Sequence, residues 1–247
     1  MASSEMASSG TIDPARFGEV ALRPLDEAQR GMAKRVQADW VSVPTATQFV
    51  DADITDLESL RGELEPRAEA AGIRLTLLAF VIKACTLALR ECPDFNASLD
   101  TACETLILKK YCNIGFAVDT PAAMVAPVIR DADRLSTMQI ADAIGDLAGK
   151  ARAGCLLAAD IEGGCFSVIN LGAIGGSGFT PAISAPELAA LGMGHAARRL
   201  IEVSGAFVPR MMLPLALACD RRMIDAVSGG RFLHVVRSRL QEPASLL

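Results

Sequence analysis

The stretch MMLPLALACDRRMID, residues 211–225, decides how the chain is organised. Its first part, Met211 to Cys219, is an apolar run broken only by Pro214, and such a run predicts a buried strand. The densest charge cluster of the chain follows at once, from Asp220 to Asp225. We therefore expect these charged side chains where a strand leaves the core. On residue types alone, a cluster of this kind indicates a solvated or internally paired strand end in an α/β domain.

Segments on both sides of this stretch alternate between helical and strand patterns. Apolar stripes predict helices over residues 27–40, 56–71, 77–91, 137–152 and 228–240. Apolar or β-rich runs predict strands over residues 47–54, 114–118, 125–129 and 165–170. Asp53 or Thr55 is the expected cap of the second helix, which Pro66 should kink, and Pro93 should end the third. No linker separates these segments, so we expect one mixed α/β domain.

Composition narrows the classes of partner. The 247 residues carry a formal net charge of -5 and are 51% hydrophobic, enough for a sizeable core. The acidic balance argues against nucleic acid, which requires a basic face, and only 4% of residues are aromatic, which leaves few platforms for base stacking. The longest apolar stretch, residues 75–89, contains Lys83 and is shorter than the roughly 20 residues of a membrane-spanning helix. We therefore expect no membrane partner.

Cysteine and histidine usage argues against a disulfide framework and a metal site. The 7 cysteines are scattered without a C-x-x-C pair, which favours reduced thiols in a cytoplasm or mitochondrial matrix. His195 and His234 show no metal-ligand spacing, and we interpret both as solvated. We expect no metal and no tightly bound cofactor. Residues 1–12 are predicted to be a flexible leader, and residues 13–247 the core domain.

A glycine-rich stretch, Gly172 to Gly178, follows the strand predicted over residues 165–170. It lacks the G-x-x-x-x-G-K-[ST] pattern of a phosphate-binding loop, so a tight turn is favoured over a nucleotide site. Asn170, Gly175 and Gly176, at the strand end and in this loop, are candidate substrate-binding residues.

Eight segments stand in a characteristic order along the chain. They are FGEV (17–20), TQFVDADITDLESLR (47–61), PDFNASL (93–99), LKKYCNIGFAVDTP (108–121), APVIRDAD (126–133), GGCFSVINLGAIGG (163–176), FTPAISAPELAALG (179–192) and FVPRMMLPLALACDRRMID (207–225). In that order they resemble the catalytic core of the dihydrolipoamide acyltransferases of 2-oxoacid dehydrogenase complexes, and above all the acetyltransferase of the pyruvate dehydrogenase complex.

The resemblance implies a chloramphenicol-acetyltransferase-like fold, in which helices flank a mixed sheet. Such cores form trimers whose active-site channels lie between subunits, with coenzyme A entering at one end and the dihydrolipoamide of lipoyl-lysine at the other. In many relatives the trimers build cages, and Leu246-Leu247 resembles the apolar C-terminus that docks neighbouring trimers. The expected partners are therefore further copies of this chain, an active acyltransferase core, or other components of a 2-oxoacid dehydrogenase complex.

Two of the three family catalytic positions depart from the pattern. The family uses a general-base histidine in D-H-R-x-x-D-G, an oxyanion-binding serine in F-[ST]-x-S-[NS]-[LI]-G, and the second aspartate of the first motif to hold the site. This sequence has Arg221 at the histidine position and Ile169 at the serine position, and only Asp225 is retained. Arginine stays protonated at neutral pH, and the isoleucine side chain has no hydrogen-bond donor. Loss of a general base costs about 10²–10⁴ in rate, and loss of an oxyanion donor about 10²–10³.

These departures lead to the hypothesis of a catalytically impaired core that acts as a structural subunit of a pyruvate dehydrogenase-type assembly. The alternative is an active acetyltransferase with displaced catalytic groups. We expect a carboxylate to neutralise Arg221, and Asp225 is the nearest one in sequence. Binding of a coenzyme phosphate by Arg221, or nucleophilic action of Cys219, are the other options for this turn. Ile169 is expected to constrict the channel, so that coenzyme A binds with a dissociation constant above roughly 1 mM.

Overall fold

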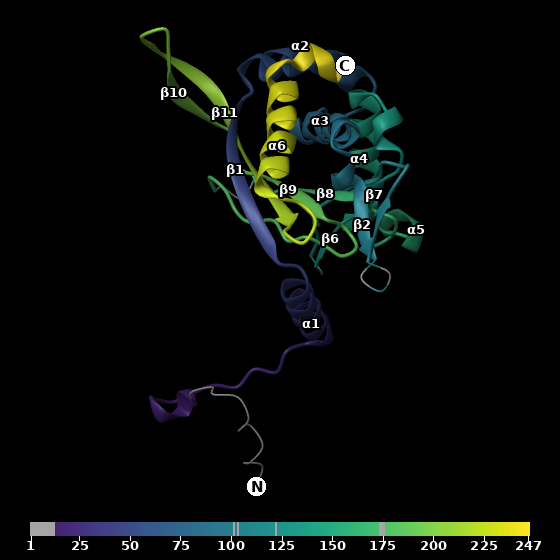
Figure 1. Cartoon of the computed structure of the whole chain (residues 1–247), viewed down its shortest axis with the longest axis vertical. Coiled ribbons are helices and arrows are strands. Elements are labelled where there is room, and N and C mark those ends of the chain that lie inside the picture. Colours follow the sequence, from purple (N-terminus) through teal and green to yellow (C-terminus); the bar gives the residue numbers. More distant parts are fainter. Residues whose placement is uncertain (1–12, 101, 103, 122, 173–175) are drawn as a thin grey trace. The chain divides into compact units, whose positions relative to one another are not determined.

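A computed structural model of the chain describes residues 13–100, 102, 104–121, 123–172 and 176–247 (Figure 1). The chain divides into two units, Met1–Val36 and Gln37–Leu247. The first contains a 3-10 helix, Pro14–Arg16, and the beginning of helix α1, Glu27–Ser42. The sheet and all later elements belong to the second unit. The division between a leader and a core at residue 13 stays a prediction.

A mixed sheet forms the centre of the second unit. Its described strands are β1 (Thr45–Asp53), β4 (Ile114–Phe116), β7 (Val128–Ile129), β8 (Phe166–Asn170), β9 (Ala189–Met193), β10 (Ala197–Val203) and β11 (Ala206–Asp220). Their order is β1-β11-β9-β8-β4-β7, with β10 paired to β11. β8 runs parallel to both β4 and β9, whereas the other neighbours are antiparallel. Two small sheets, each of two strands, pair β2 (Ala97–Asp100) with β3 (Thr105–Leu108), and β5 (Val118–Asp119) with β6 (Met124–Val125).

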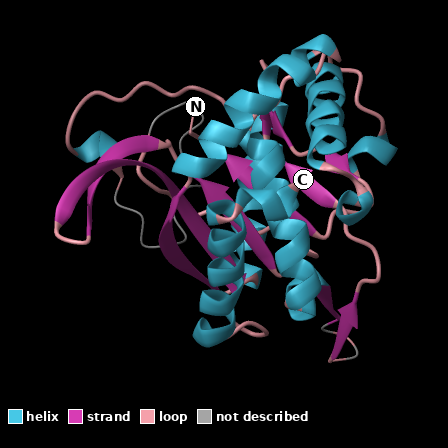
Figure 2. Ribbon diagram, turned by 90° about the horizontal axis from the view of Figure 1, so that it is seen from above, coloured by secondary structure: helices cyan, strands magenta, loops and turns pink. Residues whose placement is uncertain are grey.

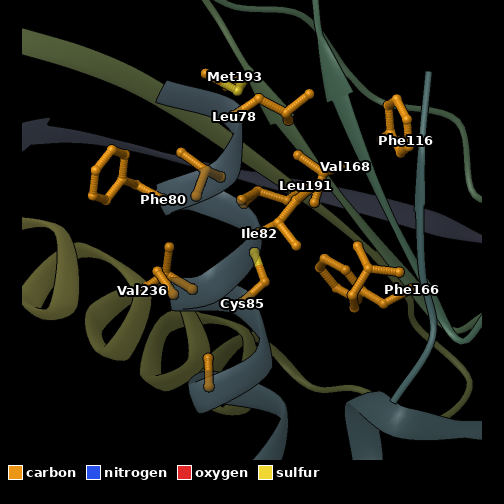
Figure 3. Packing of buried hydrophobic residues seen from close by; sticks show 14 of the residues in the cluster. Leu78, Phe80, Ile82, Cys85, Phe116, Phe166, Val168, Leu191, Met193 and Val236 are labelled. Atoms are coloured by element: carbon orange, nitrogen blue, oxygen red, sulfur yellow. The ribbon is translucent and has the colours of Figure 1, made fainter. Parts of the chain in front are cut away.

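Helices cover one face of the main sheet (Figure 2). They are α2 (Thr55–Ala70), α3 (Leu77–Glu91), α4 (Thr137–Arg152) and α6 (Ala226–Gln241), whereas the short α5 (Ala158–Ile161) lies beside β7. Helix α3 is apolar on most sides because it is central: it contacts α4 and α6, and its side chains also face the sheet. In Figure 3, Leu78 and Ile82 of α3 lie close to Val168 of β8 and Leu191 of β9. This packing confirms the predicted α/β fold with a mixed sheet flanked by helices.

The N-terminus of helix α2 differs from the one that the sequence predicts. Ile54 occupies the cap position, but the Asp53 carboxylate accepts hydrogen bonds from the Thr55 N–H at 3.0 Å and the Thr55 hydroxyl at 2.6 Å. The predicted cap at Asp53 or Thr55 was therefore wrong, because Ile54 is the cap and makes no side-chain capping hydrogen bond, while Asp53 binds only the first residue of the helix. The helix runs through Pro66, and Ala68 beyond it is fully buried, so Pro66 does not end the helix.

The strands predicted over residues 114–118 and 125–129 are each divided in two. β4 and β7 pair in the main sheet, whereas β5 and β6 form a separate hairpin. Pro127 lies between β6 and β7 and has no N–H to continue a ladder, although its carbonyl accepts from the Phe116 N–H at 3.0 Å. The proline thus divides one predicted strand between two sheets.

Two hairpins, β2–β3 and β10–β11, and the pairing of β9 with β8 and β11 create further strands that were not predicted. β11 begins five residues before the predicted strand at residue 211, because it pairs with β10 in a hairpin before it pairs with β9. β2, β3, β9 and β10 were likewise not predicted. Among the described residues, all cysteines are free thiols, and no helix is long and apolar enough to cross a membrane.

Candidate active site

Ile169 lies in β8, on the face of the sheet turned away from α3. Exposure alternates along β8 between buried residues that pack on the helices and the half-buried Ser167 and Ile169. Ile169 pairs with Gly192 of β9. A Cβ atom at Gly192 would lie 2.7 Å from the ring of Phe179, which places this ring next to the paired position. Ile169 therefore lies near an aromatic ring, and its side chain offers no hydrogen-bond donor.

The backbone after β8 is held by His195. The Asn170 side-chain oxygen accepts from the Gly172 N–H at 2.9 Å. His195 Nδ1 lies 2.9 Å from the Gly172 carbonyl oxygen, and the His195 N–H donates to the Gly176 carbonyl at 3.0 Å. The exposed ring confirms the interpretation of His195 as a solvated loop residue, with a role in ordering the turn. Gly175 lies outside the described residues, and substrate binding by Asn170, Gly175 and Gly176 stays a prediction.

The turn after β11 is built on a buried ion pair. Asp220 is fully buried, and its carboxylate accepts hydrogen bonds from Arg222 Nε at 3.0 and 3.1 Å and from Arg222 Nη2 at 2.6 Å. The planar guanidinium fits a carboxylate with two parallel hydrogen bonds, which compensates for burying the charge. Part of the predicted charge cluster is thus internally paired.

Arg221 is exposed, and its guanidinium lies beside the turn. Its N–H donates to the Pro44 carbonyl at 2.8 Å, and its guanidinium donates to the Ile224 carbonyl at 3.3 Å. The ion pairs found among the described residues do not include Arg221. The predicted pairing with Asp225 was therefore wrong for the single chain. An exposed guanidinium is solvated by water and does not require the counter-charge that a buried one needs.

Asp225 is used for another purpose, as the cap of α6. Its carboxylate accepts from the Ser228 N–H at 2.6 Å. Hydrogen bonds from Ser228 hold the pKa of Asp225 below its usual range, and the charge of Arg221 adds a smaller lowering. The retained family aspartate therefore has a structural task that Arg221 does not alter.

The two altered positions are separated both along and across the strands of the sheet. Ile169 pairs with Gly192, which pairs with Ala216 of β11, four residues before Asp220. Four residues of strand span about 13 Å, and β9 separates β8 from β11, which adds about 10 Å across the sheet. The sequence motifs predict that Ile169 and Arg221 belong to one site. Within one chain, they do not touch.

A further polar site was not predicted from the sequence. A cavity of about 970 Å³ is lined by Ser167, Lys109 and Glu187, among others. Glu187 is 7% exposed, and its Oε1 accepts from the Ser167 hydroxyl at 2.9 Å. Glu187 Oε2 and Lys109 Nζ are both buried, without a hydrogen-bond partner among the described residues.

Burial shifts both titratable groups of this cavity toward their neutral forms. It raises the pKa of Glu187 to about 7, while the Ser167 hydrogen bond and the charge of Lys109 oppose that rise. It lowers the pKa of Lys109, and the charges of Cys165 and Glu187 oppose that shift. The sequence signal that could have revealed this site is Glu187, an isolated carboxylate directly before the apolar run that forms β9. In the described part of the chain, no group of three or more His, Cys, Asp or Glu residues could hold a metal ion.

Comparison with known proteins places this geometry in a family. The sequence profile of the 2-oxoacid dehydrogenases acyltransferase family (catalytic domain) matches residues 18–247. The dihydrolipoyllysine-residue acetyltransferase component of the pyruvate dehydrogenase complex of Pseudomonas aeruginosa is 44% identical over 96% of this chain. The chain spans only 43% of that relative's own length.

Solved structures agree in fold. A crystal structure of Azotobacter vinelandii dihydrolipoamide acetyltransferase, from work on the catalytic roles of a serine, a histidine and an asparagine, superposes with a TM-score of 0.90 at 42% identity, covering 97% of this chain and 99% of that one. The sequence separations among those three residues equal the separations among Ile169, Arg221 and Asp225. The cubic core of a pyruvate dehydrogenase multienzyme complex matches with a TM-score of 0.90 at 41% identity, over 97% of this chain and 99% of that one.

Chloramphenicol acetyltransferase shares the fold alone. It matches with a TM-score of 0.52 at 16% identity, covering 87% of this chain and 96% of that one. This similarity confirms the predicted chloramphenicol-acetyltransferase-like architecture. Together with the profile match and the identity to acetyltransferase components, it establishes that the chain belongs to the family of 2-oxoacid dehydrogenase acyltransferase catalytic domains.

Proposed function

We propose that the chain is a catalytically impaired acyltransferase core that serves as a scaffold subunit in a pyruvate dehydrogenase-type assembly. One observation carries the proposal: both positions that the family pattern assigns to base and oxyanion donor hold side chains unable to act in those roles. Arg221 carries a permanent cation, and Ile169, which pairs with Gly192, has no hydrogen-bond donor in its side chain. The equal residue separations in the Azotobacter vinelandii enzyme support the alignment of these positions.

Self-association follows from the distance between the two positions. Ile169 and the Arg221 turn are separated by about 13 Å along the strands and about 10 Å across them, so a site that contains both needs a second copy of the chain. We infer a trimer or a multiple of three, in keeping with the similar structure that forms a cubic core. At the C-terminus, Leu246 is fully buried whereas Leu247 is 64% exposed, which leaves an apolar side chain for docking neighbouring trimers.

The decisive experiment measures acetyl transfer between coenzyme A and dihydrolipoamide by the assembled protein. We expect a rate at least about 10³-fold below that of the Azotobacter vinelandii core, because both the base and the oxyanion donor are missing. Turnover in the ordinary range of about 1–10³ per second would instead favour the alternative, an active acetyltransferase with displaced groups. The similar proteins, which are acetyltransferases by name, favour that alternative.

Two physical measurements accompany the assay. Light scattering should find a trimer or a larger assembly, and a uniform monomer at micromolar concentration would contradict the scaffold role. Calorimetric titration should give a dissociation constant for coenzyme A above roughly 1 mM, because Ile169 adds bulk in the channel. Micromolar binding would show that the isoleucine does not obstruct it.

A further inference from the structure

The cavity beside β8 contains two opposite charges that do not meet. Lys109 Nζ and Glu187 Oε2 are buried in the same cavity, yet they form no ion pair among the described residues. Each is held in place by its own backbone: the Lys109 N–H donates to the Asn96 carbonyl at 2.9 Å, and the Glu187 N–H donates to the Ser184 carbonyl at 2.9 Å. Within the described residues, the cavity therefore presents an unpaired donor and an unpaired acceptor from two segments whose backbone is anchored.

Charge balance determines what can occupy that space. An anion would be attracted by Lys109 and repelled by an ionised Glu187, and a cation would meet the reverse situation. A neutral group with one acceptor and one donor satisfies both side chains, since a buried polar group without a partner costs free energy. An amide has this arrangement: its carbonyl accepts from Lys109 Nζ, and its N–H donates to Glu187 Oε2.

The walls of the cavity suit an extended chain attached to that amide. Leu99, Ile107, Tyr111 and Val128 contribute apolar surface. Ser167, whose hydroxyl donates to Glu187, lies on the same face of β8 as Ile169, two residues away, or about 7 Å along the strand. An alkyl chain anchored by its amide at Glu187 would therefore run toward Ile169.

We infer that Lys109 and Glu187 recognise the amide of a thiol-bearing arm bound in this cavity. The identity of the arm rests on the proposed function, which supplies two candidates, the lipoyl arm and the pantetheine arm of coenzyme A. The two residues are specificity-determining residues that contact the substrate away from its reacting sulfur. The inference does not require that acyl transfer survives, because it concerns binding alone.

The test compares an amide with the matching ester on the assembled full chain. Calorimetry measures binding of dihydrolipoamide and of methyl dihydrolipoate, which keeps the carbonyl acceptor but has no N–H. Above pH 7, where Glu187 is mostly ionised and can accept the amide N–H, the wild-type protein should prefer the amide by about tenfold, the effect of one hydrogen bond to a charged group. Glu187→Met should abolish that preference, whereas Lys109→Met should weaken both ligands by about tenfold and keep the preference.

Controls separate recognition from structural damage. Lys110→Met removes an exposed ammonium from the same cavity wall and should leave both affinities within about twofold. Glu187→Gln keeps the side-chain shape should Glu187→Met fail to fold, and it should reduce the amide preference several-fold. Titration with pantetheine, which carries amides but no phosphate, decides the source: sensitivity of pantetheine binding to these variants would assign the cavity to the coenzyme arm.

Equal binding of amide and ester, or affinities for dihydrolipoamide and pantetheine that are unchanged in every variant, would overturn the inference. In that case the cavity cluster serves the fold alone. This result is independent of the transfer assay, since an impaired enzyme can bind the arm and an active one can ignore these two residues.

Discussion

The Asp220–Asp225 turn and the Lys109–Glu187 cavity contain similar groups in opposite situations. In the turn, the buried Asp220 is bound by Arg222, Asp225 caps α6, and Arg221 is exposed with a carbonyl partner. In the cavity, Glu187 Oε2 and Lys109 Nζ are buried without partners among the described residues. The charged side chains of the turn find hydrogen-bond partners within one chain, whereas Lys109 Nζ and Glu187 Oε2 of the cavity find none in the described part of it. In this chain, the segment with the most charged residues therefore forms a structural turn, whereas the charged groups without partners come from segments that carry fewer charges.

The largest expected effect is a gain in acetyl transfer when the family side chains are restored at positions 169 and 221. Because Asp220 and Arg222 already order it, the double substitution Ile169→Ser and Arg221→His should raise acetyl transfer by about 10³-fold or more. Each single substitution should gain little, because the other group is still missing. Steady-state assays of all four proteins measure this. Gains that simply multiply would show that the two positions do not share a site across the subunit boundary.

The next effect concerns stability in the turn. Arg222→Met leaves the fully buried Asp220 carboxylate without its counter-charge and should lower the free energy of unfolding by about 3–5 kcal/mol, measured with denaturant at fixed protein concentration. Arg199→Met is the matched control, because it breaks the exposed pair with Asp51, and it should cost less than about 1 kcal/mol. Similar losses in both variants would mean that burial does not distinguish the two pairs.

In the cavity, the expected effect depends on pH. The raised pKa of Glu187 means that the folded protein favours the protonated acid, so its contribution to stability is full below the usual glutamate pKa and is lost as pH rises through about 7. Glu187→Gln should remove that decline, which amounts to roughly 1–3 kcal/mol. Lys109→Met should steepen it, because the ammonium favours the carboxylate. A wild-type stability profile that stays flat as pH rises from the usual glutamate pKa to about 7 would contradict this assignment.

The smallest effect is expected at Asp225. Its lowered pKa means that the ionised cap contributes stability above the usual aspartate pKa, and this contribution is lost as pH falls through the folded-state value. Asp225→Asn keeps a capping oxygen and should reduce the acid sensitivity of unfolding with little change at neutral pH. Acid titration of both proteins, followed by circular dichroism, measures the difference. If both proteins unfolded at the same acid pH, the Asp225 carboxylate would not contribute to the acid sensitivity.

Local patterns were sufficient for the elements that bury a continuous face. Helix α3, helix α4 and the core-facing side of β8 were predicted because apolar periodicity reports burial directly. The family motifs placed Ile169, Arg221 and Asp225 by residue number, since they depend only on order along the chain. The partner of Arg221 was mispredicted, because nearness in sequence does not decide whether a guanidinium is buried.

Tertiary structure decided what depends on pairing between distant segments. The place of β9 between β8 and β11 and the division of residues 114–129 between two sheets follow from strand register, which no single segment contains. Register also separated Ile169 from the Arg221 turn. The cavity brings Lys109, Ser167 and Glu187 together from three segments, each of which is unremarkable alone. The sequence by itself determined the family, the central elements and the altered motifs, whereas only the folded chain decided which charges are buried, because burial is set by neighbours distant in sequence.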